Sequence, residues 1–203
     1  MNSYWVVVPS QAFDRSKSRL AAVLEPRERS AFSRACFKHV VTTARAVAGA
    51  RHTLVVSASA RVLGLARRLG VRPLVERRRG LNAAVHQAVD FARRRGARGV
   101  VVLHGDLPRL EPQEIARVIE ALRHGGVVLA PDRESSGTNA LGVGASQRFR
   151  FRFGPDSFAK HLAEARRRRL RVRVLHSAGL AFDVDTPEDY RTLCDRTIAA
   201  QLD

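Results

Sequence analysis

The chain of 203 residues lacks any long apolar stretch, and this absence excludes a membrane-spanning helix. No run approaches the roughly 18 consecutive apolar residues that a span requires. The apolar stretch Tyr4–Val8 is short, follows no basic residue and breaks at Pro9, so it lacks the pattern of a secretory signal peptide. We therefore expect a cytoplasmic protein. Because no linker, repeat or low-complexity segment divides the chain, we expect residues 1–203 to form one domain.

Cysteine is scarce, which excludes a disulfide framework. Cys36 and Cys194 lie far apart, and in an intracellular chain such residues are more typical of buried thiols than of a bridge or a metal site. The seven histidines show no pair at metal-ligand spacing, and the predicted helical positions of His86 and His161 are compatible with the surface. No Ser/His/Asp or Cys/His triad stands out. A reaction would therefore depend on positioning and a metal ion, without a protein nucleophile.

Acidic residues are few beside basic ones, 19 against 36, which gives a net charge of +17. Lysine occurs only at Lys17, Lys38 and Lys160, so arginine dominates. This balance fits either a nucleic-acid-binding protein or a solvated surface with a bias toward arginine. The arginine runs lack interleaved aromatic residues for base stacking, so we favour the solvated surface. The positive field would still attract a polyanionic small molecule such as a nucleotide.

Apolar strands alternate with amphipathic helices along most of the chain. Repeated βα units predict an α/β fold of three layers, in which a mostly parallel sheet has helices on both faces. The rhythm changes after Pro131, where a polar loop leads into a small insertion. The predicted strands are residues 5–8, 54–57, 74–75, 99–103, 127–130, 139–143, 148–153, 172–175 and 180–184; the predicted helices are residues 26–48, 60–69, 81–94, 112–123 and 158–168, with a last one beginning at Pro187.

Carboxylates follow two of the apolar runs. Asp106 comes just after Val100–Leu103, and Asp183 and Asp185 come at the end of Leu180–Phe182. Ligands of open α/β sheets bind at the rim where parallel strands end. Asp106 could be a simple turn residue, and capping by Thr186 explains only the second half of the later motif. If the three carboxylates meet, their hard oxygen atoms predict a Mg²⁺ site and phosphate chemistry.

Two segments could bind the phosphates of a nucleotide. Lys17 and Arg19 follow the first strand and could hold phosphates, although on charge alone a solvated basic turn is the favoured interpretation. This segment lacks the glycines of a Walker A motif. Gly80 and Asn82 open a helix whose free N–H groups could meet an anion or a base carbonyl, or could form an ordinary helix start.

Two further loops are suited to an anion. Ser135–Asn139 is rich in hydroxyl and free N–H groups, and Gly154–Ser157 precedes a helix. Asp156 or Ser157 could equally serve as a helix cap. Because both loops follow the acidic strand, we expect a second, anionic substrate.

Six short motifs occur in an order that resembles one known family. They are Lys17–Leu20 (KSRL), Gly80–Ala83 (GLNA), Asp106–Pro108 (DLP), Gly137–Leu141 (GTNAL), Phe153–Phe158 (FGPDSF) with His161, and Asp183–Pro187 (DVDTP). Together they resemble the 2-phospho-L-lactate guanylyltransferase family, which also includes phosphoenolpyruvate and 3-phospho-D-glycerate guanylyltransferases. The GTNAL and FGPDSF motifs are the specific ones, and the match spans nearly the whole chain.

The resemblance implies a nucleotidyltransferase fold of the glycosyltransferase-A kind. It implies that GMP passes from GTP to the phosphate of a phosphorylated three-carbon acid, with release of pyrophosphate, on the way to the deazaflavin coenzyme F-420. It further implies roles for single residues. Asp106, Asp183 and Asp185 would hold Mg²⁺; Lys17, Arg19, Gly80 and Asn82 would contact the nucleotide; Thr138, Gly154 and Ser157 would contact the acid; and Asp106, Lys17 and Arg19 would act in catalysis.

One departure from the family pattern concerns nucleotide binding. The family usually has Pro-x-Lys after the first strand, whereas this chain has Gln11 at the lysine position. Alternatives are therefore another nucleotidyltransferase of the same fold that uses a molybdenum-cofactor or sugar-phosphate acceptor, a non-catalytic relative, and a basic nucleic-acid-binding protein. The identity of the acid and whether the chain forms a homo-oligomer are left open by the sequence.

Overall fold

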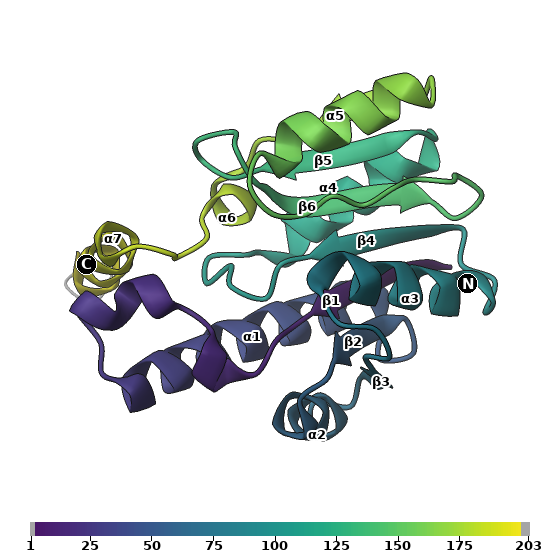
Figure 1. Ribbon diagram of the computed structural model, residues 1–203. Coiled ribbons are helices and arrows are strands. Elements are labelled where there is room, and N and C mark those ends of the chain that lie inside the picture. Colours follow the sequence, from purple (N-terminus) through teal and green to yellow (C-terminus); the bar gives the residue numbers. More distant parts are fainter. Residues whose placement is uncertain (1–2, 200–203) are drawn as a thin grey trace.

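The computed structural model describes residues 3–199, which form one seven-stranded sheet flanked by helices (Figure 1). Two short 3₁₀ helices, η1 (Phe13–Arg15) and η2 (Ser18–Ala22), follow the first strand. The strands are β1 (Tyr4–Pro9), β2 (Thr53–Ser57), β3 (Arg72–Val75), β4 (Gly99–Leu103), β5 (Val127–Pro131), β6 (Thr138–Gly144) and β7 (Val172–Val174). The helices are α1 (Pro26–Ala48), α2 (Ala60–Arg68), α3 (Leu81–Arg93), α4 (Pro112–Arg123), α5 (Ser157–Arg167), α6 (Ala178–Ala181) and α7 (Pro187–Ala199).

The sheet has the strand order β3-β2-β1-β4-β6-β5-β7 and is parallel except at β6. β6 pairs antiparallel with both β4 and β5. Its first residues therefore lie beside the ends of its two neighbours, at the same edge of the sheet. The prediction of a mostly parallel sheet is confirmed, and the antiparallel strand β6 is the strand predicted at residues 139–143.

Helices cover both faces of the sheet, as predicted. One apolar cluster joins the sheet to α1, α2, α4 and α6, and the other joins it to α3 and α5. Successive residues of β6 point into different clusters: Ala140 belongs to the first cluster, and Leu141 and Val143 belong to the second. This alternation is the period of a pleated strand.

A β-bulge interrupts this alternation at the start of β6. Ala130 pairs with Ala140, but the next residue of β5, Pro131, pairs with Thr138, so Asn139 is an extra residue. By simple alternation Thr138 would face the same side as Ala140. The bulge instead turns Thr138 toward α5, where its hydroxyl contacts His161.

Two strand predictions are wrong. Residues 180–184 are not a strand: the segment begins in α6 and continues as irregular chain, because Leu180 packs into the core from a helical turn while Phe182 and Val184 form a separate cluster with Leu20. Residues 148–153 form no ladder either. Their alternation is nevertheless real, since all three phenylalanines are buried against α3 and α5.

The predicted surroundings of the cysteines and histidines are confirmed only in part. Cys36 is buried, which raises the pKa of its thiol to about 12, and Cys194 is half-buried; both are free thiols. His86 is half-buried, but His161 is fully buried, so a surface position for His161 is excluded. No helix in residues 3–199 is long and apolar enough to cross a membrane.

Candidate active site

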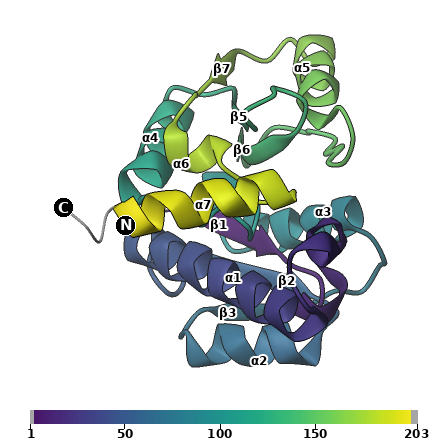
Figure 2. The ribbon, with the colours of Figure 1, turned by 90° about the vertical axis from the view of Figure 1, so that its left-hand side faces the viewer.

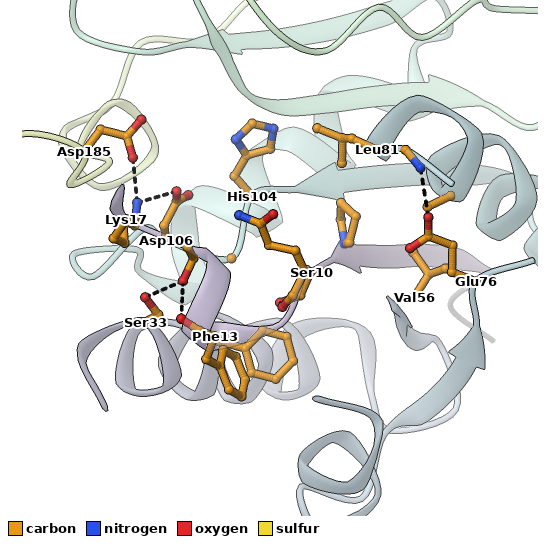
Figure 3. Close-up of a pocket in the computed structure, with 17 residues that line it drawn as sticks. Ser10, Phe13, Lys17, Ser33, Val56, Glu76, Leu81, His104, Asp106 and Asp185 are labelled. Carbon is orange, nitrogen blue, oxygen red and sulfur yellow. Dashed lines mark hydrogen bonds and ion pairs between the residues drawn. The ribbon is translucent and has the colours of Figure 1, made fainter. Parts of the chain in front are cut away.

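A pocket of about 520 Å³ opens at the edge of the sheet where the parallel strands end. Figure 3 shows Lys17, Asp106 and Asp185 at one end of it, and Leu81 and Glu76 at the other. Figure 2 looks onto this edge, where α7 lies next to the start of α1 and Phe32 of α1 packs against Tyr190 of α7. The pocket lies at the edge expected for an α/β ligand site.

Lys17 joins two segments that are far apart in the sequence. Its ammonium nitrogen lies 2.6 Å from Oδ2 of Asp106 and 2.7 Å from Oδ1 of Asp185. The lysine side chain is only 4% exposed. Burial alone would lower the pKa of Lys17, but the two carboxylates outweigh it and hold that pKa above its ordinary value. Lys17 is therefore a permanent cation at this end of the pocket.

Asp106 and Asp183 differ in their electrostatic surroundings. Burial would raise the pKa of Asp106, but the charge of Lys17 outweighs it and lowers that pKa. The pKa of Asp183 is raised by burial and by the negative charges of Asp106 and Asp185. The amide nitrogen of Asn139 donates to Asp183 Oδ1 at 3.1 Å, which offsets only part of this effect. The structure thus brings the three predicted carboxylates into one electrostatic cluster.

This cluster carries more negative charge than its protein partners neutralise. Oδ1 of Asp106 is buried and has no hydrogen-bond partner within the described chain. That orphaned oxygen, together with Asp183, fits the oxygen ligands that Mg²⁺ prefers. In this conformation no three acidic, histidine or cysteine side chains of residues 3–199 form a ready-made metal site, and the Lys17 ammonium lies between Asp106 and Asp185. The donor atoms fit a divalent cation, while the three-carboxylate site remains a prediction.

The position of Asp183 and Asp185 depends on two helix starts. Glu114, which is 4% exposed, accepts hydrogen bonds from the N–H groups of Gly179 and Leu180 and so caps α6. On the other side, Asp189 accepts from the N–H groups of Asp185 and Thr186. Thr186 accepts in return from the N–H of Asp189, which confirms the predicted cap of α7. The acidic segment is therefore held at both ends, and Glu114 is a contributor that no sequence motif indicated.

The side-chain amide of Asn82 binds the backbone of Phe153, a contact that the sequence did not indicate. Its amide nitrogen donates to the carbonyl oxygen of Phe153 at 3.0 Å, and its amide oxygen accepts from the N–H of Phe153 at 2.8 Å. This pair fixes the segment that precedes Gly154. Gly80, in front of Asn82, lines the pocket with a φ of +106°, a conformation that favours glycine.

The residues predicted for the acid lie around the start of α5. Thr138 and Ser157 are 1% and 2% exposed, Gly154 is exposed, and the N–H of Phe158 donates to the carbonyl of Ser136. None of these residues lines the 520 Å³ pocket. The residues predicted for the acid therefore lie outside the pocket that Lys17, Gly80 and Asp106 line.

Gln11 and Arg19 both follow the first strand, but only one of them lines the pocket. Gln11 lines the pocket, in the position where the family pattern has lysine. Arg19 is exposed on η2 and does not line the pocket. The structure therefore brings Lys17, Gly80, Asp106 and Asp185 to one pocket, and Arg19 is not among the residues that line it.

Solved structures of nucleotidyl- and sugar-transferring enzymes share this fold. A putative nucleotide-diphospho-sugar transferase from Desulfovibrio desulfuricans superposes with a TM-score of 0.77 at 18% identity, over 95% of this chain and 87% of that one. CMP:2-keto-3-deoxy-manno-octonic acid synthetase, solved with CTP, superposes with a TM-score of 0.64 at 15% identity, over 98% of both chains. The fold is that of the nucleotidyltransferases.

Sequence comparison narrows the class to one family. The family model described as guanylyl transferase CofC like matches residues 4–194, and the chain belongs to this family of guanylyltransferases. The phosphoenolpyruvate guanylyltransferase of Rubrobacter xylanophilus is 41% identical over 94% of this chain and 93% of its own. The 2-phospho-L-lactate enzyme of Methanothermobacter thermautotrophicus is 36% identical (90% and 80%), and the 3-phospho-D-glycerate enzyme of Phenylobacterium zucineum is 38% identical (86% and 82%).

Proposed function

We propose that this guanylyltransferase transfers GMP from GTP to the phosphate of a phosphorylated three-carbon acid. The observation that carries the proposal is the cluster of Lys17, Asp106, Asp183 and Asp185 beside a pocket of about 520 Å³. The three relatives named above supply the candidate acids: phosphoenolpyruvate, 2-phospho-L-lactate and 3-phospho-D-glycerate. Phosphoenolpyruvate is the first to test, because two relatives at 40% identity or more carry that name. The product would be the diphosphate-linked precursor of the deazaflavin coenzyme.

In the proposed reaction an oxygen of the acid's phosphate attacks the α-phosphorus of GTP. The new oxygen–phosphorus bond forms as the bond from the α-phosphorus to the β-phosphate bridge breaks, and pyrophosphate leaves with that electron pair. The attacking phosphate is already ionised near pH 7, so the chain need not supply a general base. Its task is to bring two anions together in line.

The chain's own residues divide this task. Lys17 supplies a buried positive charge where phosphate oxygens would crowd, and Gly80 lets the backbone at the start of α3 approach the nucleotide. Asp106, Asp183 and Asp185 would hold Mg²⁺. When bound there, Mg²⁺ would neutralise charge on the phosphate oxygens. Thr138, Gly154 and Ser157 would hold the acid.

The direct test incubates the purified protein with GTP, MgCl₂ and each of the three acids separately. Pyrophosphate release and the mass of the product are followed. We expect turnover with at least one acid, and a loss of at least about 100-fold in Asp106→Asn, because that change removes a charged ligand of the Mg²⁺ ion that would neutralise the reacting phosphates. Asp90→Asn is the matched control: this carboxylate is 54% exposed on α3, and its loss should leave turnover unchanged.

Two results would count against the proposal. Absence of turnover with all three acids would favour the non-catalytic relative, and full activity of Asp106→Asn would remove the carboxylate cluster from the mechanism. EDTA should stop the reaction, and excess MgCl₂ should restore it.

A further inference from the structure

The imidazole of His161 is buried between the start of β6 and the segment before α5. The residue is 0% exposed and its ring packs edge-on against Phe153, with centroids 4.8 Å apart. Both ring nitrogens are engaged: Nδ1 lies 3.0 Å from Oγ1 of Thr138, and Nε2 accepts the backbone N–H of Arg152 at 2.9 Å. The proposed reaction gives this histidine no role.

The second of these contacts determines the direction of the first. A backbone N–H can only donate, so Nε2 must be the unprotonated nitrogen of the ring. A neutral imidazole has one N–H, which must then be on Nδ1. His161 therefore donates to Oγ1 of Thr138. The hydroxyl of Thr138 accepts this bond, and its own proton remains to donate elsewhere.

The direction of this bond matters to an anion. Carboxylate and phosphate oxygens accept hydrogen bonds and do not donate them. If Thr138 donated to the ring, its hydroxyl would present lone pairs to such a ligand. With the ring as donor, the hydroxyl presents its proton instead, at no cost of reorientation when the ligand binds.

We propose that His161 is a positioning residue that sets the hydroxyl of Thr138 as a hydrogen-bond donor to the acid substrate. The inference rests on the proposed function, in which Thr138 contacts the acid. It adds a residue that acts through Thr138 and does not itself touch the substrate.

The environment keeps the ring in the required form. Burial, together with the nearby charge of His104, lowers the pKa of His161 to about 4, so the ring is neutral at any working pH near 7. The β-bulge at Asn139 supplies the other half of the arrangement, because it turns Thr138 toward α5. The neutral ring and the β-bulge thus both contribute to the orientation of the Thr138 hydroxyl.

Two substitutions separate the two bonds of the ring. In His161→Asn the amide nitrogen can take the place of Nδ1 and donate to Thr138, but the bond to Arg152 is lost. In His161→Gln the amide oxygen can take the place of Nε2 and accept from Arg152, but the donor to Thr138 is lost. The two variants are therefore matched controls for one another.

We expect His161→Gln to raise the KM for the acid about tenfold, the effect of one hydrogen bond to a charged group, while the KM for GTP stays within about twofold. His161→Asn should restore the acid KM to within about threefold of the original. Thr138→Val should match His161→Gln, and combining the two should add nothing, since both remove the same donor. Thermal unfolding of each variant shows that it is folded.

A purely structural role for His161 predicts the opposite order, in which glutamine is harmless and asparagine is damaging. That order, or equal effects of the two variants, overturns the inference. If His161→Gln does not fold, Thr138→Ser and Thr138→Val replace it: serine should keep the acid KM and valine should raise it. If wild-type protein turns over but Thr138→Val leaves the acid KM unchanged, the inference fails and the guanylyltransferase reaction stands. Lack of turnover with every acid refutes the proposed function itself.

Discussion

The ammonium of Lys17 and the carboxylate of Asp106, 89 residues apart in the sequence, form an ion pair of 2.6 Å at the edge of the sheet. Lys17 has a φ of +59°, in the left-handed region that residues other than glycine seldom adopt. Such a conformation persists where surrounding contacts determine it. Here those contacts are the two carboxylates, so the backbone turn before η2 and the acidic cluster stabilise each other.

Lys17→Met should lower the free energy of unfolding by about 2 kcal/mol or more, because Asp106 is left with a buried charge and no cation. MgCl₂ should raise the melting temperature of this variant more than that of the wild type, since the freed carboxylates gain a substitute cation. Chemical and thermal unfolding measure both effects. Lys38→Met, at an exposed site on α1, is the control. An unchanged stability of Lys17→Met would show that the ion pairs contribute nothing.

Asn82→Ala should raise the KM for the acid more than the KM for GTP, because the lost amide releases Phe153 and the segment leading to Gly154. A contact between Asn82 and the nucleotide predicts the reverse. Steady-state kinetics with each substrate varied in turn decides between them. Gln87→Ala is the control. The Gln87 amide lies on the same helix, but it hydrogen-bonds the backbone of Val75 and Arg77 and not that of Phe153.

Glu114→Ala should destabilise the protein by about 2 kcal/mol, because it leaves two N–H groups of α6 and the N–H of Glu111 without their acceptor. Urea unfolding measures the loss. Glu120→Ala on the same helix removes a carboxylate that is 60% exposed and should change stability by less than about 0.5 kcal/mol. Equal effects of the two variants would contradict the capping role.

Stability should fall below pH 6.5 because of His161. The folded protein lowers the pKa of this group from 6.5 to about 4, so in this range the unfolded chain binds a proton that the folded chain does not. The contribution is complete above pH 6.5 and is lost as the pH falls toward 4. Between pH 7 and pH 5 it amounts to about 2 kcal/mol. Urea unfolding at both values should show this difference in wild type and in His124→Asn, but not in His161→Asn.

Local pattern accounts for most of the architecture and for part of the site. The bounds of α1, β4 and α4 agree with the sequence prediction, because strong apolar periodicity and a proline at the first helical turn determine them locally. Residues 180–184 were wrongly predicted as a strand, because a short apolar run has no period that distinguishes strand from helix. Glu114, which caps α6 from another helix, decides the outcome there.

In the candidate site too, the sequence predicted some features and not others. Carboxylates after apolar runs indicated Asp106, Asp183 and Asp185, and the structure gathers them. The burial of His161 and the clamp of Asn82 on Phe153 were not readable from the sequence, because each depends on a partner brought near by the tertiary fold.

The single extra residue at Asn139 has a consequence for how this segment can vary. Deleting Asn139 would restore the regular pleat with Thr138 still facing α5, but it would remove the amide that donates to Asp183. The hairpin loop between Pro131 and Thr138 can change length without this penalty, since it precedes the paired positions. Chimeras between relatives should therefore keep the residue count from Thr138 to Ala140.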